Sequence, residues 1–170
     1  LYMDSQPEQL EQPVEPEKPE KPEQPKLPFS TFDLQKPLAD AIKKMGFEYC
    51  TPIQAQSLVH TLAGHDVTGK AQTGTGKTAA FLITIINDLL SNPIEEERYI
   101  AEPRALVVAP TRELAIQIAS DAQLLTHDCG MSVVTLVGGE DYQKQNRALD
   151  AKPVDIVVAT PGRLLDFVQN

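Results

Sequence analysis

Apolar residues recur at helical spacing early in the part of the chain that has an apolar pattern. Leu38, Ile42 and Met45 follow one another at intervals of four and three positions, which places them on one helical face, and Gly46 stands where such a helix would end. A second short helix is predicted over residues 52–62, because a proline suits the first turn of a helix. From residue 29 onward the sequence therefore has the pattern of an ordered domain.

Further along, short runs rich in Val, Ile and Leu alternate with helix-type segments. Strands are predicted at 105–109, 132–137 and 154–159, and helices at 113–125, at 142–149 and from near Gly162. Such near-continuous apolar strands between helices indicate an α/β fold with a parallel sheet flanked by helices on both faces. Ligands of such sheets bind beyond the carboxyl ends of the strands, where the loops at 71–78, 110–113, 138–139 and 160–163 fall. Asp155 is expected at a strand start near the surface rather than as a catalytic acid.

Residues 1–28 have a different composition, with repeated Pro, Glu, Gln and Lys. Such a segment cannot bury apolar area, so we expect a disordered tail of extended, solvated conformers. Its role is left open between a spacer and a tail that docks a partner. The chain begins with Leu rather than Met, so we expect a partial sequence.

Length and charge limit the remaining possibilities. The 170 residues suffice for one domain plus the tail. The net charge of −9 argues against a nucleic-acid binder that relies on a basic surface, so any RNA contact must rest on a few placed groups. Cys50 and Cys129 are isolated in the sequence, as is typical of reduced thiols in the cytoplasm. No apolar run is long enough to span a membrane, and a cytoplasmic protein is expected.

One stretch carries a definite chemistry. It runs Ala71, Gln72, Thr73, Gly74, Thr75, Gly76, Lys77, Thr78. It follows a candidate strand at 66–70 and opens an apolar helical segment at 79–90, which is the context of a phosphate-binding loop. Gly74 and Gly76 let backbone N–H groups turn toward an anion, Lys77 can reach the outer phosphates, and Thr78 offers Mg²⁺ a hydroxyl ligand. The sequence predicts binding of a nucleoside triphosphate in preference to a turn that binds nothing, although Ala71 stands where the general pattern has Gly.

Three further signatures occur in order around this loop. Residues 46–54 (GFEYCTPIQ) resemble the Q motif of the DEAD-box RNA helicases, and Phe29 lies 17 positions before Gly46, where that family keeps an aromatic residue. Residues 110–114 (PTREL) resemble motif Ia, and Gly138-Gly139 with residues 160–163 (TPGR) resemble the GG element and motif Ib. The family's phosphate loop also begins with Ala. The resemblance covers residues 29–170, as part of the first RecA-like helicase domain, and the wording is closest to a bacterial branch that acts in mRNA turnover with the RNA degradosome.

The resemblance implies roles for these residues. ATP and Mg²⁺ are the implied cofactors, with Lys77 and Thr78 catalytic, and Gln54 selects adenine through its paired donor and acceptor while Phe29 packs against the base. RNA is the implied partner, and its sugar-phosphate backbone would be held by Pro110, Thr111, Arg112, Gly138, Gly139, Thr160, Pro161, Gly162 and Arg163. Two plainer alternatives remain: Gln54 caps a local turn, and Glu113 caps its helix or pairs with Arg112.

Other parts of the family pattern are not found within these 170 residues. The Asp-Glu-Ala-Asp motif and the second RecA-like domain are expected beyond Asn170, so the chain by itself is expected to be inactive as an ATP-dependent RNA helicase. A ribonuclease scaffold of the degradosome is a further implied partner. The competing interpretations are another P-loop NTPase, such as a DNA translocase or a kinase, and a non-catalytic ATP-binding module.

Overall fold

The computed structural model describes residues 26–94, 97–100 and 102–169. The expectation of a disordered tail therefore concerns residues that, up to 25, lie outside the described part. Leu27 and Pro28 already belong to the ordered body, since the amide of Cys50 donates to the carbonyl oxygen of Leu27 at 2.7 Å and Pro28 forms a β-bridge with Tyr49.

The first half of the chain is helical. A short 3-10 helix (Phe29–Thr31) precedes α1 (Lys36–Lys44), α2 (Pro52–Thr61) and α3 (Lys77–Ser91). The three α-helices match the predicted helices to within two residues, whereas the 3-10 helix was not predicted. Gly46 has a φ of 78°, a left-handed conformation that turns the chain just after α1, as the sequence suggested.

The second half forms the sheet. Strands β1 (Ala105–Val108), β2 (Val133–Leu136) and β3 (Ile156–Ala159) are joined by α4 (Arg112–Thr126) and α5 (Tyr142–Asp150), and α6 (Pro161–Gln169) follows. All pairings are parallel, in the order β1-β3-β2, with Val107 and Thr135 both opposite Val158. The predicted parallel sheet flanked by helices is confirmed.

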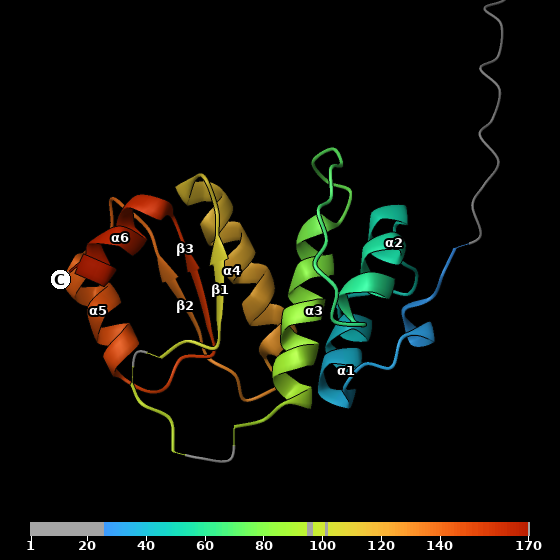
Figure 1. Cartoon of the computed structure of the whole chain (residues 1–170), viewed down its shortest axis with the longest axis horizontal. Coiled ribbons are helices and arrows are strands. Elements are labelled where there is room, and N and C mark those ends of the chain that lie inside the picture. The colour runs from blue at the N-terminus through green and yellow to red at the C-terminus, as the bar shows by residue number, and fades with distance from the viewer. Residues whose placement is uncertain (1–25, 95–96, 101, 170) are drawn as a thin grey trace, which may run out of the picture.

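The side chains of the central strand alternate between two cores. Ile156 and Val158 join the larger cluster, which α1, α3 and α4 share, while Val157 and Ala159 join a smaller cluster with α5 and α6. Figure 1 accordingly shows α4 between the sheet and the α1–α3 group, with α5 and α6 on the far side of the sheet. The layers set the strand ends, and hence the loops after them, in fixed positions.

Coverage of the sheet is less complete than expected. Leu106 and Val108 of β1 are exposed, and both lie on the α5–α6 face, in register with Val157 and Ala159. Among the described residues β1 is an edge strand, and no residue of α6 is fully buried. The prediction that both faces are covered therefore holds for β3 but is wrong for β1.

The predicted strand at 66–70 is also wrong. Residues 65–72 have no regular secondary structure, and 66–70 are exposed. A strand is stabilised by hydrogen bonds to a neighbouring strand. No described strand lies beside this segment, because the sheet contains only β1, β3 and β2 in the part of the chain that the structure covers.

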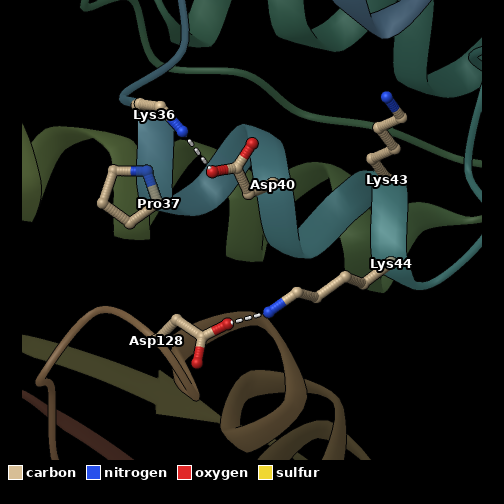
Figure 2. Close-up of a pocket in the computed structure, with 6 residues that line it drawn as sticks. All are labelled: Lys36, Pro37, Asp40, Lys43, Lys44 and Asp128. Atoms are coloured by element: carbon tan, nitrogen blue, oxygen red, sulfur yellow. Dashed lines mark hydrogen bonds and ion pairs between the residues drawn. The ribbon is translucent and has the colours of Figure 1, made fainter.

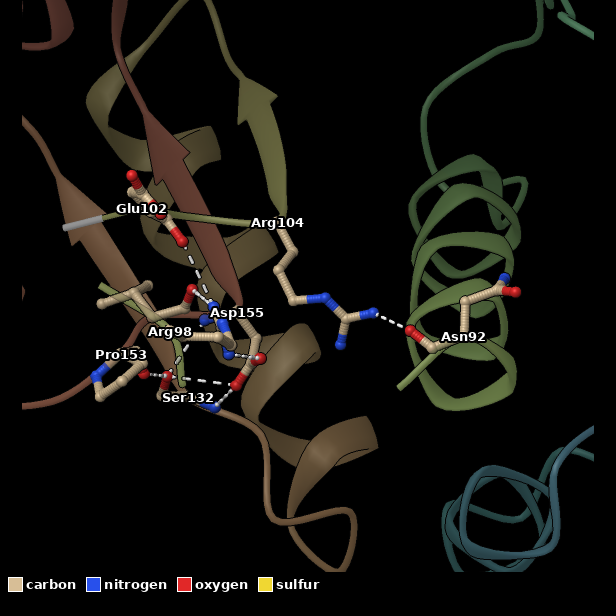
Figure 3. Close-up of polar contacts among 8 residues, drawn as sticks. Asn92, Arg98, Glu102, Arg104, Ser132, Pro153 and Asp155 are labelled. Atoms are coloured by element: carbon tan, nitrogen blue, oxygen red, sulfur yellow. Dashed lines mark hydrogen bonds and ion pairs between the residues drawn. The ribbon is translucent and has the colours of Figure 1, made fainter. Parts of the chain in front are cut away.

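Asp155 is buried, contrary to the expectation of a surface position. Its carboxylate pairs with Arg98 at 2.6 Å and accepts from the Ser132 amide at 2.8 Å; the two paired side chains are only 12% and 17% exposed. Figure 3 shows this network at the starts of the strands, with Arg104 reaching across to the backbone of Asn92 near the end of α3. The network ties the connection between α3 and β1 to the sheet, at the end opposite the predicted binding loops.

A shallow cavity of about 510 Å³ separates α1 from the end of α4. Figure 2 shows Lys44 crossing it to Asp128, and Lys36 pairing with Asp40 at 2.7 Å along α1. The hydrogen bond to Lys44 lowers the pKa of Asp128 and raises that of Lys44. Both groups are therefore charged at neutral pH, where the pair supports the α1–α4 contact. Its contribution is lost as the pH falls through the lowered pKa of Asp128 or rises through the raised pKa of Lys44.

Two other sequence-based expectations concern thiols and membranes. Cys50 and Cys129 are both free, and burial raises the pKa of each thiol above its usual value. Among the described residues, every helix is too short or too polar to cross a membrane.

Candidate nucleotide and phosphate-binding site

The predicted phosphate loop leads directly into a helix. Gly74 and Gly76 have φ values of 79° and 88°, which L side chains rarely adopt, and α3 begins at the next residue, Lys77. The first N–H groups of a helix have no partners within it, and the helix dipole adds positive charge there. The loop therefore ends at the start of a helix, as the sequence predicted, and its binding of phosphate stays a prediction.

The ammonium group of Lys77 lies inside this loop. Its Nζ donates to the carbonyl oxygens of Gln72, at 2.9 Å, and of Ala71. Thr75 Oγ1 donates to the same Gln72 carbonyl at 2.8 Å. Residues 72–74 are exposed, so an anion that enters the loop from solvent comes close to this ammonium group. Thr78, the predicted Mg²⁺ ligand, is half-buried in the first turn of α3, and Thr73 is exposed at the loop tip.

Gln54 attaches the start of α2 to the phosphate loop. Its Nε2 donates to the Gly76 carbonyl at 3.1 Å, and its Oε1 accepts from the Thr51 amide at 2.9 Å. Thr51 Oγ1 in turn donates to the Thr75 carbonyl at 2.7 Å. The structure thus brings the Q-motif glutamine and Lys77 to the same place, on either side of Gly76.

The capping alternative for Gln54 is realised at the same time. Thr51 and Gln54 form a capping box, in which each side chain bonds the other's backbone N–H. An amide carries two N–H donors and an oxygen with two lone pairs, so one donor and one acceptor remain after these bonds. Gln54 is only 5% exposed, and its selection of adenine stays a prediction.

Gly76 is required by packing as well as by conformation. A Cβ at this position would lie 2.3 Å from Gln54 Nε2, whereas a Cβ on Gly74 would meet nothing within 4 Å. We therefore expect Gly74→Ala to cost only the left-handed strain of about 1–2 kcal/mol. Gly76→Ala should in addition displace the Gln54 amide, which adds about 1 kcal/mol for the lost hydrogen bond.

Amide hydrogen exchange at the start of α2 distinguishes the two substitutions. Gly76→Ala should speed exchange in residues 51–57, and Gly74→Ala, with the same backbone strain, should leave that segment protected. Equal protection in both variants would mean that the hydrogen bond from Gln54 to the Gly76 carbonyl does not hold the start of α2 in place.

Phe29 does not present an open ring. It is buried in the larger core cluster, stacks on Phe47 with ring centroids 6.5 Å apart, and its amide donates to the Glu48 carbonyl at 3.1 Å. Phe29 is thus attached to the Q motif through the backbone of Glu48. Its predicted packing against a base has no support in this arrangement and stays a prediction.

The three predicted RNA-binding loops follow the three strands at one end of the sheet. They comprise Pro110, Thr111 and Arg112 after β1, Gly138 and Gly139 after β2, and Thr160, Pro161, Gly162 and Arg163 after β3. Figure 1 shows these strand ends at the same end of the molecule as the start of α3. Thr111 Oγ1 caps α4 by accepting from the Leu114 amide at 3.3 Å. Glu113, expected to cap this helix or pair with Arg112, does neither within the described residues.

Two arginines join these loops. Arg112 Nη1 donates to the Gly138 carbonyl at 3.3 Å, and its Nη2 lies 3.3 Å from Glu140 Oε1. Arg163 donates both Nη groups to the Glu140 carbonyl, at 3.2 and 3.3 Å. The segment 138–140 is thus held between Arg112 from the β1 loop and Arg163 from the β3 loop. A Cβ on Gly139 would lie 2.5 Å from Arg112 Nη1, so a larger residue there would displace the end of this arginine side chain.

Arg163 is more enclosed than a phosphate-gripping side chain at the surface would be. Its side chain is 12% exposed, its guanidinium lies 5.7 Å from the centre of the Tyr142 ring, and its Nε is 3.5 Å from Asp166. In this structure Arg163 supports the loops, and Arg112 is the more accessible cation.

Sequence reasoning missed two of the residues that complete this site. Thr51 connects the Q motif to the phosphate loop, and Glu140 receives both arginines. Thr51 could have been found from the Thr-x-x-Gln capping pattern. For Glu140 the only signal was its place directly after the two glycines.

Comparisons with known proteins all match one family. The family model of DEAD/DEAH box helicases matches residues 51–170. The ATP-dependent RNA helicase RhlB of Pseudomonas putida is 59% identical over 142 residues, which are 84% of this chain and 36% of that protein. RhlB of Shewanella sediminis is 52% identical over the same length, covering 84% of this chain and 32% of that protein. The chain spans about a third of the length of the curated relatives it matches.

Solved structures show the same fold. A DEAD box protein from Methanococcus jannaschii matches 84% of this chain and 37% of its own with a TM-score of 0.71 and 34% identity. A hypothetical ATP-dependent RNA helicase from Sulfolobus tokodaii matches 80% of this chain and 37% of its own with a TM-score of 0.67 and 36% identity. These likenesses confirm the expected RecA-like architecture and the resemblance stated from the motifs. The chain therefore belongs to the DEAD/DEAH box helicase family.

Proposed function

We propose that this chain supplies the ATP-binding loop and an RNA-backbone surface of an ATP-dependent RNA helicase. The observation that carries the proposal is the junction at Gly76, where the Gln54 amide and the Lys77 ammonium flank one phosphate loop. After its bonds to Thr51 and Gly76 the Gln54 amide keeps one donor and one acceptor, which is the pair that reading an adenine edge uses.

The residues of the loop suit a nucleotide bound with Mg²⁺. The left-handed glycines and the start of α3 direct N–H groups toward the phosphates, and Lys77 neutralises their charge. Thr78 is the residue that would hold Mg²⁺, which supplies charge neutralisation at the outer phosphates when bound. The family's remaining catalytic groups, the acidic motif and the second domain, are proposed to lie outside these 170 residues, and the chain alone is proposed to be inactive.

The RNA contact follows from a few placed groups rather than from net charge. Arg112, the capping hydroxyl of Thr111 and the exposed glycines 138 and 139 lie on one surface at the strand ends. Backbone and hydroxyl donors of this kind bind phosphates and sugars, and such contacts carry no sequence information. We therefore propose sequence-independent binding of one RNA strand, with Thr160, Pro161 and Gly162 extending the surface and Arg163 supporting it.

The wider role rests on likeness. The relatives named RhlB are ATP-dependent RNA helicases, and they represent the bacterial branch that the residues in and around the motifs resemble. We propose on this basis a cytoplasmic role in mRNA turnover, with a ribonuclease scaffold of the degradosome as partner.

Replacing Gln54 by Ala tests the nucleotide assignment. In the longer protein that contains this chain, Gln54→Ala should reduce the preference for ATP over GTP, because the amide that matches the adenine edge is lost. RNA-stimulated hydrolysis of the two nucleotides, compared as kcat/KM, measures the change.

Gln56→Ala is the matched control, since Gln56 lies two residues away on the same helix with its side chain exposed. Unchanged selectivity in Gln54→Ala would remove the adenine assignment and leave only the capping role.

A further inference from the structure

The carboxylate of Glu140 pairs with Arg112, which is the more exposed of the two arginines at the proposed RNA-binding surface. Glu140 Oε1 lies 3.3 Å from Arg112 Nη2, and the other Nη of Arg112 bonds the Gly138 carbonyl. Carboxylate and phosphate oxygens are alternative acceptors for the same guanidinium donors. The side chain therefore stands where a phosphate oxygen of RNA would be bound.

The pair is built so that the carboxylate can leave. The Arg112 and Glu140 side chains are 42% and 40% exposed, and ion pairs in such positions are weak because water and salt screen them. An RNA phosphodiester carries the same single negative charge as the carboxylate and offers two non-bridging oxygens, so it competes for a guanidinium held this loosely.

Departure of the carboxylate would not release the loop. Arg163 holds Glu140 through its backbone carbonyl, and this arginine is enclosed beside Tyr142. Gly138 is held independently through its own carbonyl by Arg112. The segment 138–140 thus keeps its position while the side chain of Glu140 swings away.

We propose that the Glu140 carboxylate is an internal competitor for the phosphate that Arg112 binds, and that it lowers the RNA affinity of this surface. The inference rests on the proposed function, since it requires RNA to bind at Arg112. Glu140 thereby sets how tightly one phosphate is held, without contacting the nucleotide.

The test uses the longer protein, a fluorescently labelled single-stranded RNA and a non-hydrolysable ATP analogue. Glu140→Gln keeps the shape and removes the charge. It should tighten RNA binding by about two- to five-fold, which is about 0.4–1 kcal/mol at 1.4 kcal/mol per tenfold change. The gain should shrink as salt is raised, because the exposed pair is screened.

Glu113→Gln is the matched control. It makes the same change of net charge one residue from Arg112, at an exposed position without an ion pair to any described residue. A gain in Glu140→Gln that exceeds the gain in Glu113→Gln, and that disappears in an Arg112→Ala background, supports the competitor role.

The other outcomes separate the two proposals. If Arg112→Ala weakens RNA binding but Glu140→Gln does not tighten it beyond the control, the competitor role is overturned and the RNA surface stands. Weaker binding by Glu140→Gln would likewise overturn it, because the carboxylate would then orient Arg112 for RNA. If Arg112→Ala and Arg163→Ala both leave RNA affinity unchanged, the proposed RNA surface itself fails.

Discussion

Replacing Asp155 by Ala is expected to lower the local stability of the sheet by about 3–5 kcal/mol. The substitution removes the counter-charge of Arg98, whose side chain is only 17% exposed, and it removes the acceptor of the buried Ser132 amide. A charge or amide left without a partner in the interior costs its full desolvation penalty. Arg98 also donates to the backbone carbonyls of Glu102 and Val154, so its displacement would loosen the connection that leads into β1.

Amide hydrogen exchange in residues 154–159 measures this loss, since it reports the opening free energy of that segment within a larger protein. Exchange there should be faster by about two orders of magnitude or more, at 1.4 kcal/mol per tenfold change. Asp66→Ala is the control, because Asp66 is exposed in an irregular segment. A change no larger in Asp155→Ala than in Asp66→Ala would mean that Arg98 finds other partners at no cost.

The pattern of the sequence was sufficient for most of the architecture. Runs such as residues 154–159 can hardly be anything but a buried strand, and β3 is buried on both faces as that pattern requires. The phosphate loop could also be predicted, because its glycines adopt a left-handed backbone conformation that other residues rarely adopt. Features of this kind depend only on a few adjacent residues, so the sequence alone predicts them.

What the sequence did not reveal depends on contacts between distant positions. The pairing of Asp155 with Arg98 spans 57 residues, and neither residue stands in a motif. The prediction of a strand at 66–70 was wrong because a strand forms only beside a neighbouring strand, and the residues of the segment do not show whether such a neighbour is present. Glu140 combines both difficulties, because its carboxylate meets Arg112 only when the loops after β1 and β2 are folded side by side.

The same distinction explains the double role of Gln54. As a local residue it completes a capping box with Thr51, which a four-residue pattern can predict. Its second contact, to the Gly76 carbonyl, lies 22 residues away and joins two motifs into one site. Because the cap holds the side chain in place, the amide is presented to the loop at little further cost in conformational entropy.

Lys77→Ala is expected to lower the RNA-stimulated ATPase rate of the longer protein by about 10²–10³-fold or more. Lys77 is the cation inside the phosphate loop, where its Nζ contacts the carbonyl oxygens of Ala71 and Gln72. Removing a charge that neutralises the transferring phosphoryl group weakens the transition state more than the bound substrate. The fold should survive, because these two contacts join a loop that is largely exposed.

Steady-state ATP hydrolysis at saturating RNA measures the loss, and circular dichroism with thermal unfolding checks the fold. Lys70→Ala is the matched control, since Lys70 carries the same charge in the same segment but is exposed and lies before the loop. Hydrolysis should be close to normal in Lys70→Ala and nearly absent in Lys77→Ala. If Lys77→Ala kept more than about a tenth of the rate, transition-state stabilisation by this ammonium would be worth less than 1.4 kcal/mol, too little for the central role assigned to it.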